Sequence, residues 1–143
     1  MAKTFRCQIV TPAEEVFDGE VSYVDLPAWD GQMGVMASRS AMLVQLGCGP
    51  LHIEAADGGR RDYVLRDGFA QMDSDRLTLL TESAEPFESI DLAEAERSLA
   101  EVRSKFSAAI EGRSDSSEAI DTLTRRQQFH LQRVAAARSR SGR

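Results

Sequence analysis

The stretch LPAWDGQMGV, residues 26–35, decides the fold of this chain, together with LGCGPLHI at residues 46–53. In each stretch a turn with two glycines joins short apolar runs of the kind that form strands. Glycine adopts the positive φ that tight turns need. Neither stretch carries a catalytic motif, a phosphate-binding motif or a cluster of metal ligands. The pattern therefore favours a docking module over an enzyme.

Alternating apolar and polar residues over the first 85 positions predict β-strands. The alternating runs lie at residues 5–9, 21–26, 51–53, 63–65 and 77–80. Between them we read turn signals at residues 18–19, 30–31, 57–59, 67–68 and 73–75. Short strands, each closed by a turn after roughly ten residues, are typical of an all-β sandwich or barrel.

The composition changes near Pro86, after which the pattern becomes helical. Asp91 is expected to cap the first helix, with Glu94 as its partner in a capping box. An apolar stripe at three- and four-residue spacing comes next. Its members are Leu92, Ala95, Leu99, Val102, Phe106 and Ile110.

Gly112 is expected to end the first helix, and a capping box of Asp115 and Glu118 to start a second. A short polar turn between two helices implies an antiparallel hairpin. The sequence therefore predicts an α+β chain, with a β-sandwich docking domain at residues 1–86 and a helical hairpin with a basic end at residues 87–143.

Composition and charge limit the possible classes of protein. The 143 residues are 42% hydrophobic and 28% charged, with a net charge of −6, which is ordinary for a globular domain. No apolar run is long enough for a membrane-spanning helix or a signal peptide. Residues 122–143 hold six arginines and no acidic residue. This basic end either seeks an acidic partner surface or is a solvated tail that balances an acidic body.

Few residues are candidates for chemistry. The two cysteines, Cys7 and Cys48, are expected to be reduced thiols in the core. His52 is expected to face solvent or to line a polar seam, and His130 lies in no metal-binding motif. We therefore expect no catalytic residue, no metal and no cofactor, although a catalytic sandwich stays possible in principle.

Several short motifs occur in a telling order along almost the whole chain. They are TPAE at residues 11–14, VFDGEV at 16–21, GQMGV at 31–35, RDGFA at 66–70 and ESAE at 82–85, followed by Ile90 and Asp91. In this order and spacing the chain resembles the epsilon subunit of the rotary F-type ATP synthase.

The resemblance implies a β-sandwich of about ten strands and a C-terminal helical hairpin. It implies a non-catalytic part of the central stalk that binds the gamma subunit, sits on the membrane rotor ring and couples proton flow to ATP synthesis. Through its C-terminal helices it can reach the catalytic alpha and beta subunits and inhibit ATP hydrolysis. The implied location is peripheral, at the cytoplasmic face of the bacterial inner membrane, without membrane insertion and without nucleic acid.

The resemblance also assigns candidate site residues. The partner-contact candidates are Asp30, Gln32, Met33, Arg39, Met42, Arg125, Arg126 and Arg133. Arg39 stands where the family usually has a histidine near gamma, and Gln32 where it often has an acidic residue, so that Asp30 would supply the charge toward the rotor ring. The alternatives to a partner-contact role are that Met33, Val35, Met36 and Met42 are core residues and that Arg39 is a solvated loop residue.

Some family members bind ATP through an Ile/Leu-Asp-x-x-Arg-Ala motif. Here Ile90 and Asp91 are present, but Glu94 replaces the arginine that would face phosphate. A carboxylate repels phosphate, so we expect weak or no ATP binding. The rival interpretation is a free-standing ligand-binding β module whose helices form a nucleotide-sensing lid.

Overall fold

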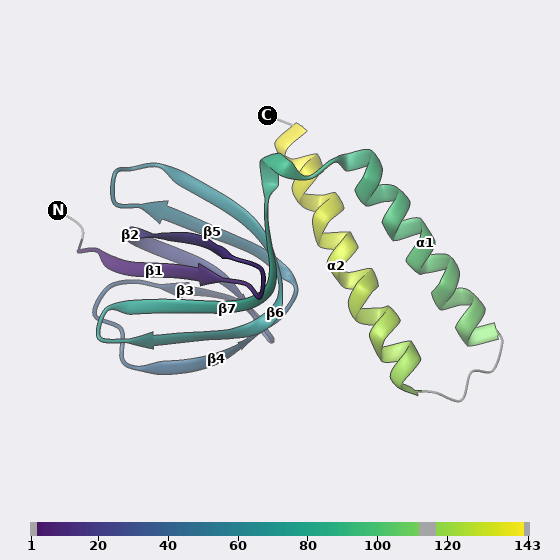
Figure 1. Ribbon diagram of the computed structural model, residues 1–143, viewed down its shortest axis with the longest axis horizontal. Coiled ribbons are helices and arrows are strands. Elements are labelled where there is room, and N and C mark those ends of the chain that lie inside the picture. The colour runs from purple at the N-terminus through teal and green to yellow at the C-terminus, as the bar shows by residue number, and fades with distance from the viewer. Residues whose placement is uncertain (1–2, 112–116, 142–143) are drawn as a thin grey trace. The chain divides into compact units, whose positions relative to one another are not determined.

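The computed structural model describes residues 3–111 and 117–141, and it divides into two compact units (Figure 1). The units comprise residues 1–86 and residues 87–143. The first unit holds the β-strands and the second holds the helices.

The first unit consists of β-strands. In the described part of the chain these are β1 (Phe5–Val10), β2 (Glu15–Ala28), β3 (Gly31–Val35), β4 (Met42–Leu46), β5 (Gly49–Ala55), β6 (Arg60–Asp73) and β7 (Arg76–Pro86). The predicted class, strands followed by two helices, is confirmed. Seven strands replace the expected ten or so, because β2 and β6 each run for 14 residues. Each of these long strands takes the place of two shorter strands, because its two ends pair with different neighbours.

The long strands change partners along their length. The first part of β6 pairs with β5, from Arg60 to Leu65, and the second part pairs with β4, from Gly68 to Met72. In the same way β2 pairs first with β1 and then with β3 and β5. The ladder runs in the order β1-β7-β6-β4-β2-β3, with β1 pairing parallel to β7 and antiparallel to β2. The strands therefore fold back on themselves and enclose a core.

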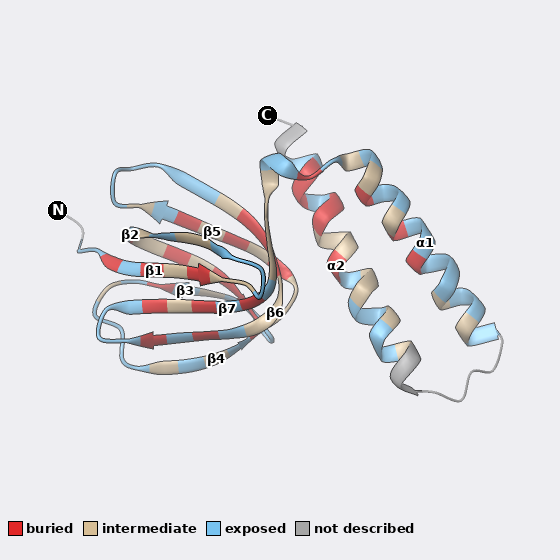
Figure 2. Ribbon diagram, viewed as in Figure 1, coloured by how far each residue is buried: buried red, intermediate tan, exposed pale blue. Residues whose placement is uncertain are grey.

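The core is built from alternate residues of the strands (Figure 2). On β1 these are Phe5, Cys7 and Ile9, each at most 1% exposed, as the alternation predicts. Burial raises the pKa of the Cys7 thiol to about 12, so this thiol stays protonated at neutral pH. Cys48 is only half-buried, with its Sγ 3.6 Å from Asp67 Oδ1, so the expectation of a core thiol holds for Cys7 alone.

Two predicted turns lie inside strands instead. Asp18 and Gly19 fall within β2, where they pair with β1, and Asp67 and Gly68 fall within β6. Asp67 has a φ of 53° and Gly68 a φ of 115°, so the backbone bends at the point where β6 changes partners. The Thr81 hydroxyl donates a 3.0 Å hydrogen bond to the Arg66 carbonyl and stabilises this bend. The Asp67-Gly68 pair has the positive φ that such a pair signals, and the sheet uses that geometry as a kink, whereas neither Asp18 nor Gly19 has a positive φ.

We predict that Gly68→Ala destabilises the β unit severely. A Cβ at position 68 would lie 1.9 Å from the Leu80 carbonyl oxygen, at a φ that side chains rarely adopt. We expect a loss of about 3 kcal/mol or more in the free energy of unfolding, measured by urea unfolding followed by circular dichroism.

The control for this prediction is Gly58→Ala. Gly58 has a φ of 90°, and nothing lies within 4 Å of the added Cβ. This variant isolates the backbone term, about 1–2 kcal/mol. Equal losses in the two variants would show that the close approach of β7 does not matter.

The second unit is a helical hairpin. It comprises η1 (Phe87–Ser89), α1 (Leu92–Glu111) and α2 (Ser117–Ser141). Asp91 caps α1 as predicted, because its Oδ1 accepts hydrogen bonds from the backbone N–H groups of Ala93 and Glu94 at 2.9 and 3.3 Å. The predicted stop at Gly112 and the predicted cap Asp115 lie outside the described residues, and the side chain of Glu118, the predicted capping-box partner, is not described either.

Among the residues whose burial is described, the buried ones lie toward the start of α1 and toward the end of α2. Ala95, Leu99 and Val102 are buried on α1, and the buried residues of α2 begin at Phe129. Ile110 was expected in the apolar stripe but is 55% exposed. It lies in the other half of α1, where neighbouring Phe106 is also only partly buried.

Candidate functional site

A row of exposed side chains crosses the strands on the outer side of the β unit. The ladder pairs Gln45 with Phe69, Phe69 with Leu80, and Leu80 with Val10. Phe69 is 52% exposed and Leu80 51%. Leu43, two residues before Gln45 and so on the same side of β4, is 71% exposed. We call Leu43, Phe69 and Leu80 the apolar face.

Both ends of this row have distinctive neighbours. At one end the Trp29 backbone N–H donates a 2.9 Å hydrogen bond to the Gln45 carbonyl, and the Trp29 side chain is exposed. At the other end an open cavity of about 320 Å³ adjoins Leu80. Val10, Thr11, Pro12, Gly68, Leu80, Thr81 and Glu82 line it. Large apolar side chains gathered in this way on an outer face are typical of a protein-binding surface.

Sequence reasoning did not single out the apolar face. Phe69 precedes buried Ala70, and Leu80 follows buried Leu79. In each strand, alternate residues point into the core, and Phe69 and Leu80 occupy the positions between them. This alternation was the sequence signal that could have identified both as outward-facing.

The predicted contact residues on the β unit lie mainly around β3. Asp30 is exposed in the turn before β3, and Gln32 Nε2 donates to the Pro50 carbonyl at 3.2 Å. Arg39 is exposed, and its Nη1 lies 3.5 Å from the Gly34 carbonyl oxygen. Met33 and Met42 are half-buried and pack against the core.

Val35 and Met36 are the other two residues for which a place in the core was the alternative interpretation. Val35 is fully buried, whereas Met36 is 64% exposed. Of these four residues, Val35 is a core residue, Met33 and Met42 pack against the core, and Met36 is exposed.

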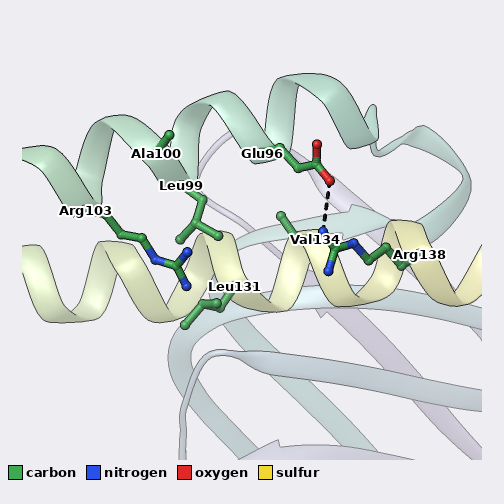
Figure 3. Close-up of a pocket in the computed structure, with 7 residues that line it drawn as sticks. All are labelled: Glu96, Leu99, Ala100, Arg103, Leu131, Val134 and Arg138. Carbon is green, nitrogen blue, oxygen red and sulfur yellow. Dashed lines mark hydrogen bonds and ion pairs between the residues drawn. The ribbon is translucent and has the colours of Figure 1, made fainter.

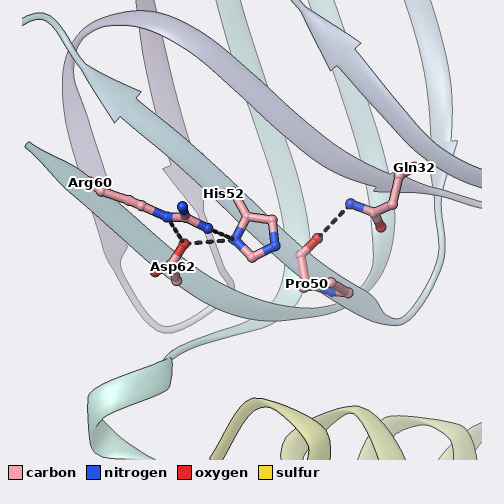
Figure 4. A network of polar contacts seen from close by, with 5 residues as sticks. All are labelled: Gln32, Pro50, His52, Arg60 and Asp62. Carbon is pink, nitrogen blue, oxygen red and sulfur yellow. Dashed lines mark hydrogen bonds and ion pairs between the residues drawn. The ribbon is translucent and has the colours of Figure 1, made fainter. Parts of the chain in front are cut away.

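His52 lies in a polar network on β5 and β6 (Figure 4). Its Nδ1 is 2.6 Å from Asp62 Oδ1 and 3.3 Å from Arg60 Nη2, and Arg60 Nε donates to Asp62 at 3.0 Å. Partial burial raises the pKa of Asp62, but the hydrogen bonds from His52 and Arg60 outweigh it and hold that pKa below its ordinary value. The expected polar seam is present.

A second polar cluster joins the two helices. The Glu94 carboxylate accepts hydrogen bonds from Ser98 Oγ at 2.9 Å and from Arg133 Nη2 at 2.5 Å. Glu94 therefore does not act as the capping-box partner of Asp91, because its carboxylate is engaged with its own helix and with α2. The Arg133 guanidinium, and then the Ser98 hydroxyl, hold the pKa of Glu94 below its ordinary value.

The predicted basic end of α2 is divided among different environments. Arg125 is exposed and pairs with Asp121 at 3.4 Å, and Arg126 is half-buried. Arg133 is only 7% exposed. Arg138 pairs with Glu96 on α1 at 3.1 Å, at the rim of an interhelical groove of about 450 Å³ (Figure 3). Leu99, Ala100, Arg103, Leu131 and Val134 complete its lining.

Metal sites and membrane-spanning helices are both missing from the part of the chain that the structure describes. Within these residues, no group of three or more His, Cys, Asp or Glu side chains could hold a metal ion. None of the described helices is both long and apolar enough to cross a membrane.

Comparison with known proteins gives the family. Residues 4–87 match the family model described as ATP synthase, Delta/Epsilon chain, beta-sandwich domain. The ATP synthase epsilon chain of Synechococcus sp. strain WH7803 is 37% identical over 120 residues, which are 84% of this chain and 85% of that relative. The chain belongs to the ATP synthase epsilon chain family.

Other relatives of the family agree. The epsilon chain of Synechococcus sp. strain CC9902 is 33% identical over 99% of this chain and 98% of its own length. A chain in the cryo-EM structure of Euglena gracilis mitochondrial ATP synthase (OSCP/F1/c-ring) superposes with a TM-score of 0.78 at 23% identity. It covers 93% of this chain and 81% of that chain, and at this identity it supports the fold alone. The predicted family and the predicted β-sandwich are confirmed.

We predict that this family member binds ATP no more tightly than about 1 mM, or about 4 kcal/mol. The Glu94 carboxylate repels phosphate and already holds Arg133. Isothermal titration of the full chain with ATP tests this, with Glu94→Gln as the matched variant that lacks the charge. A dissociation constant well below 1 mM for the unaltered chain would contradict the expectation and favour the nucleotide-sensing lid.

Proposed function

We propose that this chain is a non-catalytic subunit of the central stalk of a proton-translocating ATP synthase, and that its β unit docks the gamma subunit to the membrane rotor ring. The observation that carries the proposal is the apolar face, Leu43, Phe69 and Leu80, all more than half exposed. Burying a fully exposed side chain of this size contributes about 1.5–3 kcal/mol, so covering the exposed half or more of one of these contributes about 1–2 kcal/mol. A partner of matching shape would therefore gain most of its binding energy here.

The turn between β2 and β3 is the proposed contact with the rotor ring. It presents Trp29, which is 68% exposed, beside Asp30 and Gln32. An exposed tryptophan supplies a large rigid contact, and the polar residues beside it fix orientation. Attachment through the ring would place the protein at the cytoplasmic face of the bacterial inner membrane as a peripheral subunit.

The helical hairpin is the proposed regulatory part. Exposed Arg125, with Arg126 beside it, offers positive charge to acidic surfaces of the catalytic alpha and beta subunits. Contact there would slow ATP hydrolysis by obstructing rotation, without any chemistry by this chain.

The docking proposal predicts that polar substitution of the apolar face weakens binding to gamma. Phe69→Ser combined with Leu80→Ser should raise the dissociation constant roughly 100-fold, measured by biolayer interferometry with gamma from the same organism. Both side chains are half exposed, so the fold should survive, which circular dichroism checks. Ile110→Ser is the matched control, since Ile110 is 55% exposed on α1. Equal effects of the face variant and the control would remove the face from the interface.

If the β unit docks gamma and the hairpin only regulates, residues 1–86 should suffice for docking. A chain truncated after Pro86 should fold and bind gamma nearly as well as the full chain, because the apolar face lies wholly within this unit. A pull-down with gamma compares the two. If the truncated chain folds but does not bind, the hairpin contributes to docking. If neither binds, the stalk role itself is wrong.

A further inference from the structure

We propose that Glu94 is a built-in counter-ion for Arg133, and that this ion pair within the chain latches α2 against α1. Both residues belong to the hairpin, so the latch acts within this chain and needs no gamma subunit.

Arg133 lies in an environment that is largely closed to water. Its side chain is only 9% exposed. A guanidinium withdrawn from water is costly unless an anion or hydrogen-bond acceptors surround it. Glu94 supplies a full negative charge from α1, at 2.5 Å from Nη2. His130 Nδ1 lies 3.3 Å from Nη1, and the Phe129 ring centroid is 5.9 Å from Cζ.

The pair joins positions that are distant in the sequence. Glu94 is in the first turn of α1 and Arg133 is in the second half of α2, 39 residues later, so their contact exists only when the hairpin is closed. Ser98, one turn along α1, donates to the other oxygen of the carboxylate and fixes its orientation. The ion pair therefore joins the two helices near the end of the hairpin that lies away from their connection.

Among the described residues, the other features that hold the hairpin closed are a short set of apolar side chains and a second ion pair. On α2, Phe129 and Val134 are buried. Among the buried residues of α1, only Leu99 and Val102 are larger than alanine. Toward the connection Phe106 is half-buried and Ile110 exposed, so the far half adds little apolar contact. The neighbouring pair of Glu96 and Arg138 has side chains 47% and 66% exposed, and exposed pairs contribute little. The Glu94 side chain is itself 43% exposed, so the better shielding of the Glu94–Arg133 pair comes from Arg133, whose side chain is 9% exposed.

The test is charge reversal in the full chain, with hairpin closure measured directly. Spin labels at Ser104 and Gln128, both exposed, report the distance between the helices by double electron–electron resonance. Cys48→Ala removes the half-buried thiol, and Cys7 is fully buried and escapes labelling. Glu94→Arg and Arg133→Glu should each lower the ratio of closed to open hairpin by about fivefold or more.

The double variant Glu94→Arg/Arg133→Glu is the decisive measurement. It restores opposite charges, so it should recover most of the closed population. Glu96→Arg is the matched control at the exposed pair, and we expect a much smaller effect there. If a single variant unravels α2, circular dichroism will show lost helix, and recovery of that signal in the double variant supports the latch equally. No change in the single variants, or no recovery in the double variant, would overturn the proposal.

Discussion

The bend of β6 at Gly68 is the constraint on which the β unit depends. The backbone of β7 packs directly against Gly68, which has no side chain. A Cβ at this position would clash with the Leu80 carbonyl oxygen. The bend lets one 14-residue strand pair with β5 at one end and β4 at the other. It also fixes the phase of the next two residues, with Phe69 outward and Ala70 inward. A slip of one residue would exchange those two positions and bury the aromatic ring.

The sequence predicts local structure well here and long-range contacts poorly. Alternation of Phe5, Cys7 and Ile9 identified a strand because burial of one face imposes a period of two. Asp91 identified a helix start because its carboxylate satisfies N–H groups two and three residues away. Both signals are contained within a few residues, so no knowledge of the tertiary fold is needed to read them.

The apolar face and the Glu94–Arg133 pair depend on contacts between residues far apart in the sequence, so local sequence signals did not predict them. An outward Leu80 beside inward Leu79 looks like core until the register of β6 and β7 is known. Glu94 fits a capping box three residues after Asp91, but Arg133, 39 residues further on, takes its carboxylate instead. In the same way Asp67-Gly68 signals positive φ correctly, yet only the sheet decides whether that φ makes a turn or a bend.

Two arginines of α2 pair with carboxylates of α1, so closure of the hairpin changes how much positive charge α2 exposes. In the closed hairpin Arg133 and Arg138 are matched by Glu94 and Glu96, so α2 shows less free positive charge than its sequence implies. Opening would separate both pairs and leave α2 strongly basic. An acidic surface would then bind the open hairpin better than the closed one, and a ligand that prefers one of two states shifts the balance toward it. The Glu94 carboxylate, which is proposed to hold the hairpin closed, therefore helps to set how strongly an acidic partner must attract α2 before the hairpin opens.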